Sequence, residues 1–446
     1  MQQDLTEGDV GRQLYTMTVP MVWGILSIMS MNIVDTFYVG QLGTDPLAAM
    51  GFTFPIVSIL LSLAFGVGIG TSSVIARAIG SQQPDQVKSY ATQSLFIALG
   101  IAGVFALLGY HYMDPIFAIL GAPDSLMPLI HQFMDVWFMG SFVVVIPMVG
   151  NSSIRAAGNT KIPSLVMITV AIVNILLDPL LIFGLFGFPR MELAGAATAT
   201  VISYSIALVM GLYFLGYRLG FLSWRACFTK VWQSWKAILR IALPATGTNL
   251  IAPASVALTT WMVSRYSPEA VAGFGVASRI ESICIVVIMG LSSIMGPFVG
   301  QNWGARKTER VATALNLSFR FVTLWGLGVS IMLWVLAEPV VTLFSEDPEV
   351  IASATRYLHL VPVTYLFLGL IMVTSSSSNG MGNPHPSLIM SFLRLLGLYI
   401  PLALGLSYIL DLSGIYLAAA LSNALVGLGA WYWSSRFRRI QQEHYG

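Results

Sequence analysis

Long apolar stretches alternate with short polar connections along the whole chain. Twelve of these stretches approach or exceed the roughly 20 apolar residues that a helix needs to cross a bilayer. Runs of alternating apolar and polar residues, which would indicate a membrane β-barrel, are not seen. The pattern therefore predicts an all-α integral membrane protein with twelve spanning helices, at residues 13–39, 47–76, 91–112, 126–150, 162–187, 193–216, 237–264, 270–299, 312–336, 352–379, 386–409 and 413–435.

The second half of the chain repeats the first at an offset of 224 positions. The common offset is stronger evidence than the identity, which is low. Six helices per half is an even number, so both copies enter the membrane from the same side and form parallel repeats. We therefore expect two pseudo-symmetric six-helix lobes, at 1–216 and 237–446, joined by a cytoplasmic linker at 217–236. Matching pairs include Pro20 with Pro244, Gly66 with Gly290, and Gly158 with Gly382.

Composition agrees with a membrane protein. Of the 446 residues, 56% are hydrophobic and 9% are charged, whereas a soluble domain carries about 25% charged residues. The lipid bilayer is thus the expected environment, and neither a nucleic-acid partner nor a large soluble domain is expected. We expect the protein to act as a monomer.

The distribution of positive charge predicts the orientation. Of the 22 lysines and arginines, sixteen fall at the N-terminus, in the even-to-odd connections and in the C-terminal tail. By the positive-inside rule, both termini of this multi-pass protein should face the cytoplasm. A cell (inner) membrane location follows as an expectation.

Two further segments have competing interpretations. The linker mixes tryptophan with lysine and arginine, which suits an amphipathic segment on the membrane surface and equally suits a plain linker with a few anchoring aromatics. The glycines of GVGIG at 66–70 sit inside a predicted span, so we interpret them as packing residues. No usable nucleotide-binding motif is present, so we expect no cofactor, no direct use of ATP and no enzymatic activity.

The strongest candidates for chemistry are two acids in the first half. Asp35 lies in the outer part of the first predicted helix and Asp178 in the outer part of the fifth. Each lies about 22 Å beyond a proline, Pro20 or Pro163, so the two acids can share a depth. Asn174 lies four residues before Asp178 and projects from the same helix face.

A carboxylate at mid-helix costs roughly 2.5–3.5 kcal/mol on insertion scales, so such residues usually serve a function. Burial and a second nearby carboxylate both disfavour the charged form, which suits reversible proton binding. The same oxygen-rich group suits Na⁺, since hard cations favour oxygen ligands. The alternatives without an ion-binding role are that Asp35 is solvated near a helix end and that Asp178 forms a structural hydrogen bond beside Pro179.

Several polar residues are secondary candidates for the same pocket. Each is individually more typical of a helix–helix hydrogen bond, and Asp135 suits an interfacial or solvated role. These candidate neighbours are Asn151, Thr198, Thr200 and Tyr38.

Two other groups of residues complete the set of candidates. Pro20 and Gly24 lie in the first helix before Asp35, where a proline permits the helix to bend. One hypothesis is that protonation of the two acids changes this bend and releases a bound substrate. The alternative is a static kink. In the second half, a structural charge network is favoured over a role in coupling or binding. Its members are Arg279, Glu281, Arg356 and Arg394.

The motifs resemble those of the multidrug and toxic compound extrusion (MATE) transporters over essentially the whole chain. They are VDTFYVGQLG, IPMVGNSSIRAAGNTKIP, NILLDPLLIFG and GPFVGQNWGA. The acid pair with Asn174 resembles the DinF-type branch, because the acids of the NorM-type branch in helices seven and ten are missing. The resemblance implies two lobes in a V shape that export bulky, often cationic drugs, and so confer drug resistance, in exchange for H⁺ or Na⁺. It also implies that Asp35, Asn174 and Asp178 form the coupling site.

Two other functions are alternatives to proton-coupled multidrug antiport by alternating access. A lipid or lipid-linked-sugar flippase would favour a more cationic cavity, to which the arginines of the second half could contribute. A membrane-embedded prenyl transferase would need Asp-rich metal motifs such as DDxxD, and the sequence has none.

Overall fold

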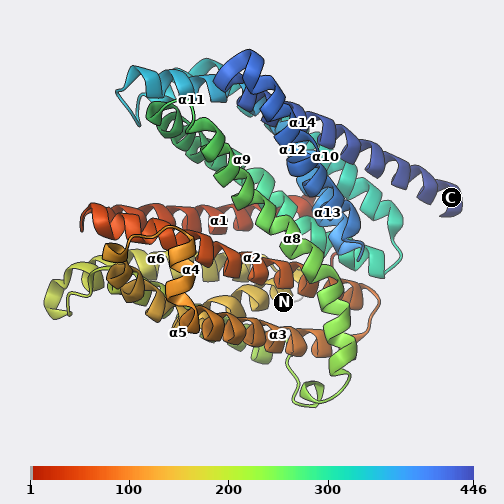
Figure 1. Ribbon diagram of the computed structural model, residues 1–446. Helices are drawn as coiled ribbons and strands as arrows, with labels where there is room; N and C mark the ends of the chain where they lie inside the picture. Colours follow the sequence, from red (N-terminus) through yellow and green to blue (C-terminus); the bar gives the residue numbers. More distant parts are fainter. Residues whose placement is uncertain (1–3, 446) are drawn as a thin grey trace. The chain divides into compact units, whose positions relative to one another are not determined.

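The computed structural model describes residues 4–445, with side chains for residues 4–435. The predicted basic tail at Arg436, Arg438 and Arg439 lies outside the described side chains. Every regular element in the described part of the chain is helical (Figure 1). This confirms the all-α prediction.

Within residues 4–445, each half of the chain supplies seven α-helices. Those of the first half are α1 (Val10–Gly40), α2 (Thr44–Gly80), α3 (Pro84–His111), α4 (Met113–Ile119), α5 (Met127–Ala156), α6 (Lys161–Phe183) and α7 (Glu192–Tyr213). Those of the second half are α8 (Val231–Val263), α9 (Pro268–Gly304), α10 (Thr308–Val341), α11 (Pro348–Leu360), α12 (Tyr365–Gly380), α13 (His385–Phe392) and α14 (Ile400–Tyr445). Short irregular turns join them, of which η4 (Arg225–Cys227), η5 (Pro362–Thr364) and the π-helical η6 (Leu393–Tyr399) matter below.

Eleven helical stretches of the described chain are long and apolar enough to cross a membrane, and the last of them holds two spans. This stretch, His385–Ser435, has 51 residues, about 77 Å of helix against a hydrocarbon core of about 30 Å. Asp411 breaks it with a left-handed φ of 49°. A Cβ on Gly414 would lie 2.8 Å from the Ser407 nitrogen, so the chain folds back here. The prediction of twelve spans is confirmed.

The tenth span differs from the prediction in one respect. A single helix was expected over 352–379, but the structure breaks it into α11, η5 and α12. Pro362 opens the break because proline has no N–H to continue the helix. Its carbonyl oxygen accepts a hydrogen bond from Ser330 Oγ of α10 at 2.5 Å, which holds the broken segment against its neighbour.

The internal repeat is visible in the helix boundaries. Helices α2 and α9 begin and end 224 positions apart, as do the starts of α3 and α10 and the starts of α6 and α13. The turns agree as well. Gln82 and Arg306 share a left-handed φ of 56° and 59°, and Gly158 and Gly382 one of 81° and 84°. The two halves therefore share one scaffold, as the sequence predicts.

The chain forms two compact units whose limits differ from the expected lobe boundaries at two places. One unit comprises Val19–Thr246 with Asp4 and Leu5, and the other comprises Thr6–Thr18 and the chain from Gly247 onward. Helices α1 and α8 therefore each contribute to both units. The division falls beside Pro20 in α1 and just after Pro244 in α8, the two prolines that the repeat pairs.

In the first unit, α5 is the central helix and packs against α2, α3 and α7. Close backbone contacts at glycines bring α2 against its neighbours. A Cβ on Gly66 would overlap Thr246 Oγ1, and one on Gly70 would lie 2.6 Å from the Ile238 carbonyl oxygen. Gly68 faces Ser152 of α5 in the same way. The interpretation of the GVGIG segment as packing glycines is confirmed.

In the second unit, α12 takes the corresponding central place against α9, α10 and α14. The segment before α1 belongs to this unit because two basic residues hold it. Lys307 directly precedes α10, and Arg310 lies in the first turn of α10. Lys307 Nζ donates to the Thr6 carbonyl oxygen at 2.9 Å, and Arg310 donates to the carbonyl oxygen of Gly8 at 2.6 Å and to Gln13 Oε1 at 3.0 Å.

We expect Gly66→Val to lower the melting temperature of the purified protein, because overpacking a tight contact costs about 1–3 kcal/mol. Gly51→Val in the same helix is the matched control, since a Cβ there meets nothing within 4 Å. The melting temperature is measured in detergent by tryptophan fluorescence. Equal shifts for the two variants would contradict the packing role of Gly66.

Candidate functional site

Helices α1 and α6 lie side by side and run in the same direction in a constant register. Ser164 Oγ donates to the Pro20 carbonyl oxygen at 2.5 Å. Near the other end of the pair, the rings of Tyr38 and Phe183 meet edge to face with centroids 6.1 Å apart. Both contacts join residues 144 or 145 positions apart. The same register sets Asp35 opposite Pro179 and Leu180, directly after Asp178.

The structure thereby brings the two predicted acids together. Asp178 is fully buried, with 0% of its surface exposed, and Asp35 is half-buried. The register of the two helices places Asp178 within one helical turn of the level of Asp35. The expectation of a shared depth on one lobe agrees with this placement, and a fully solvated Asp35 does not.

Asn174 is the second fully buried polar residue here, one helical turn before Asp178. Its Nδ2 donates to Thr200 Oγ1 of α7 at 3.3 Å. Four oxygens of the group have no hydrogen-bond partner: both of Asp178, Oδ1 of Asp35 and Oδ1 of Asn174. A buried polar oxygen without a partner costs free energy. Protons or a hard cation would satisfy these oxygens.

The remaining predicted neighbours are placed differently. Thr200 contacts the group through Asn174, whereas Thr198 bonds the Ala194 carbonyl oxygen of its own helix at 2.7 Å. Asn151, near the end of α5, has a buried Oδ1 with no hydrogen-bond partner. The described residues contain no cluster of three or more His, Cys, Asp or Glu arranged to hold a metal ion. The group we call the acid pair therefore consists of Asp35 and Asp178, with Asn174 and Thr200 beside it.

The predicted hinge residues anchor α1 to α6. Pro20 accepts the bond from Ser164, and a Cβ on Gly24 would lie 3.1 Å from Met167 Sδ and 3.2 Å from Ser164 Cα. Helix α1 continues unbroken through Pro20. The absence of a side chain at Gly24 is what lets the two helices approach closely at this level.

The charged residues of the second half separate into two sets. Glu281 accepts a hydrogen bond from the Tyr357 hydroxyl and interacts electrostatically with Arg394. Arg394 also donates to Asn423 Oδ1 at 3.4 Å. Arg279 and Arg356 are exposed on α9 and α11. Glu281 and Arg394 thus form a group with Tyr357, and the two other arginines lie apart from it.

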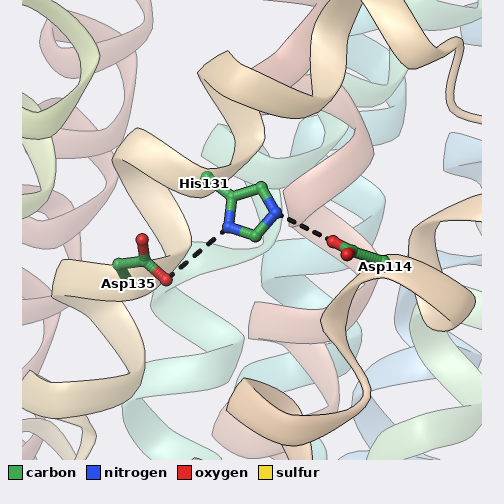
Figure 2. Close-up of polar contacts among 3 residues, drawn as sticks. All are labelled: Asp114, His131 and Asp135. Atoms are coloured by element: carbon green, nitrogen blue, oxygen red, sulfur yellow. Dashed lines mark hydrogen bonds and ion pairs between the residues drawn. The ribbon is translucent and has the colours of Figure 1, made fainter.

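Asp135 belongs to an exposed cluster at the first turns of α5 (Figure 2). His131 Nε2 lies 2.8 Å from Asp114 Oδ1 of α4, and its Nδ1 lies 3.8 Å from Asp135 Oδ1. Each of the three side chains is at least 40% exposed. Asp135 is partly exposed, although its Oδ1 is buried and has no hydrogen-bond partner. It belongs to this cluster and not to the acid pair.

Sequence reasoning missed two residues of these groups. Ser164 and Tyr357 are common polar types inside apolar helices, and nothing local marks them. Ser164 can be recognised only once α1 and α6 are paired in register. Tyr357 can be recognised only once α9 and α11 are paired, because its partner Glu281 lies 76 positions away.

A twelve-helix membrane protein with two repeated lobes and a buried acid pair in one of them has the architecture of a secondary transporter. The family model described as MatE matches residues 20–180 and 244–404, two segments again 224 positions apart. The chain belongs to the MATE family of transporters.

The chain is similar to several named members over nearly its full length. It is 38% identical over 434 residues to the FAD transporter of Shewanella oneidensis, covering 97% of this chain and 96% of that protein. It is 24% identical over 396 residues to the probable multidrug resistance protein NorM of Thermotoga maritima, covering 89% and 85%. These relatives are transporters.

Solved structures show the same fold. A mutant of the Vibrio cholerae MATE transporter VcmN superposes with a TM-score of 0.93 at 28% identity, covering 97% of each chain. VcmN in the bent form gives 0.92 at 28% identity, covering 98% of this chain and 99% of that chain.

We expect Thr200→Val to destabilise the first unit more than Thr198→Val. The first change leaves the buried Asn174 amide without its partner, which costs about 1–3 kcal/mol. The second removes only a hydroxyl that bonds within its own helix. Thermal melts in detergent compare the two, and a smaller loss for Thr200→Val would show that the Asn174 bond contributes nothing.

Proposed function

We propose that this transporter exports bulky, often cationic drugs in exchange for protons, and that the acid pair couples the two. The observation that supports it best is that Asp35 and Asp178 lie at neighbouring levels of two paired helices and carry buried oxygens that lack partners. Burial without a partner penalises the charged carboxylates, and binding protons removes the penalty. The multidrug names of several relatives support the substrate class.

The proposed cycle is alternating access. Protons from outside neutralise Asp35 and Asp178, and a cationic drug then loses its electrostatic attraction to the lobe and leaves outward. The α1 segment beyond Pro20 carries Asp35, so a change in the bend of α1 would convert proton binding at Asp35 into a change of the drug-binding site. That VcmN has been solved in a bent form supports a conformational change of this kind. Release of protons inside, at the predicted cytoplasmic face, resets the site.

Sodium is the alternative ion, because the same oxygens suit a hard cation. The decisive measurement is drug uptake into inverted vesicles under an imposed proton gradient or an imposed sodium gradient. We expect the proton gradient alone to drive uptake. Uptake driven by sodium alone would replace the proton in the proposal.

We expect Asp35→Asn and Asp178→Asn each to reduce proton-driven uptake to the level of empty vesicles, because an amide cannot take up and release the proton. Asp135→Asn is the matched control, an exposed acid of the same unit outside the pair. It should transport like the wild type. Full activity in both pair variants would end the coupling proposal.

A second candidate substrate is FAD, favoured by the 38% identity to the Shewanella oneidensis FAD transporter. The two substrates differ in charge, so the pH dependence of their binding distinguishes the two proposals. A cationic drug competes with protons for the carboxylates, so its binding should weaken as pH falls. The phosphates of FAD carry negative charge, so its binding should hold or strengthen as the carboxylates become neutral.

We expect a cationic dye to be displaced from the purified wild type on acidification, and Asp178→Asn to remove this pH dependence. Dye fluorescence and flavin fluorescence are titrated in parallel between neutral and acidic pH. Tight flavin binding that persists at acidic pH, together with weak dye binding at any pH, would assign the protein to flavin export.

A further inference from the structure

The first unit has an apolar hollow that the transport mechanism does not use. Its volume is about 660 Å³, and α2, α3, α4 and the start of α8 form its walls. The one polar side-chain group among its lining residues, the indole N–H of Trp235, is satisfied by Gln93 Oε1 at 2.8 Å. The lining residues are Ile56, Ile59, Leu63, Ile97, Gly100, Ile101, Val104, Phe105, Leu108, Gly109, Ile116, Trp235 and Leu239.

The hollow is open to the surroundings of the unit within the membrane-spanning part of the helices. Val104 is 58% exposed and Leu108 is 54% exposed. Water does not occupy a space that offers it no polar partners. Along α3 the lining runs from Ile97 to Leu108, about 16 Å of helix and so about half of the hydrocarbon core. That length matches one acyl chain of one leaflet.

One end of the hollow adjoins the basic side of the protein. Trp235 and Leu239 form this end and share one face of α8, and Lys236 projects beside them on the next row. Lys88, on the first turns of α3, and Lys236 are both exposed. Ser89 Oγ and Ser234 Oγ are 2.9 Å apart, which holds these parts of α3 and α8 together.

The linker brings further positive charge to the same end because it is fastened to α3. Gln93 Nε2 donates to the Ala226 carbonyl oxygen at 2.7 Å, and the Ser223 N–H donates to Thr92 Oγ1 at 3.2 Å. The linker exposes Arg225 and Lys230 together with Trp224, Phe228 and Trp232. Tryptophan at the interface and basic pockets between spanning helices are features of sites for anionic lipid headgroups.

We propose that this hollow is a binding site for an anionic phospholipid. One acyl chain lies in the groove along α3, and the phosphate lies among the basic residues at the Trp235 end. The apolar walls select a hydrocarbon chain, and the unpaired surface charge selects an anionic headgroup over a zwitterionic one. Its headgroup contacts are Lys88, Arg225, Lys230 and Lys236.

The acyl-chain part is tested by filling the groove. Gly100→Leu places a side chain into the hollow, whereas Gly103→Leu adds the same side chain on the same helix outside it. A Cβ meets nothing within 4 Å at either glycine, and leucine favours helix over glycine, so both variants should fold with a melting temperature no lower than that of the wild type. Native mass spectrometry of protein extracted from the membrane should show bound phospholipid in the wild type and Gly103→Leu, and a several-fold loss in Gly100→Leu.

The headgroup part is tested by charge. Lys236→Gln should lower the preference for phosphatidylglycerol over phosphatidylcholine about five-fold, the effect of about 1 kcal/mol per surface charge. Lys161→Gln, an exposed lysine of α6 that does not line the hollow, should leave the preference unchanged.

Three outcomes would overturn the proposal. Equal phospholipid retention in Gly100→Leu and the wild type excludes the groove as the acyl site. Equal loss in Lys236→Gln and Lys161→Gln excludes a headgroup site at this end. If Gly100→Leu instead reduces drug binding while its lipid content stays normal, the hollow takes drug rather than lipid.

Discussion

The proposed function depends on the two neighbouring carboxyl groups of Asp35 and Asp178 in the first unit, whose buried oxygens have no hydrogen-bond partners. In water two neighbouring carboxylates are harmless, because solvent screens them. Inside a membrane each charged or polar group needs a partner, and the four buried oxygens of Asp35, Asn174 and Asp178 have none. Such a group is stable only when something small and positive comes to it. That requirement links the fold of one lobe to the ion that would drive transport.

The register of α1 against α6 is what brings the acids together. Pro20 and Gly24 permit close contact with Ser164 at one end, and Tyr38 meets Phe183 at the other. The offsets of the two contacts differ by only one residue, so Asp35 has little freedom to slide along α6 unless α1 bends. The Pro20 end is also where α1 passes from one compact unit to the other. A bend of α1 beyond Pro20 could therefore move the Asp35 carboxylate while the hydrogen bond between Ser164 and Pro20 stays in place.

The sequence alone predicts most of the fold and part of the site. Apolar length predicts the spans, and the 224-residue offset predicts the repeat, because both depend on properties summed over many residues. The break at Pro362 was not predicted, because a proline inside a span is compatible with either a bend or a break. The hydrogen bonds from Gln93 to the linker were not predicted, because the sequence does not indicate which partner a glutamine will bind. Asp35, Asn174 and Asp178 were predicted because charge in a membrane is rare. Ser164 was not, because a serine in a helix usually bonds to its own backbone.

The second half shows that the scaffold does not require the acids. The residue equivalent to Asp35 is Thr259, whose hydroxyl lies 2.6 Å from the Tyr399 hydroxyl and also donates to the Ser255 carbonyl oxygen. Leu398 and Leu402 stand where the first half has Asn174 and Asp178. The same pair of helices is therefore built once with its polar groups satisfied and once with them open. A buried polar group without a partner is unfavourable, so the open arrangement of the first pair of helices is consistent with the proposed reversible binding of an ion. The asymmetry of the repeat at this pair of helices lies in which copy leaves its polar groups without partners.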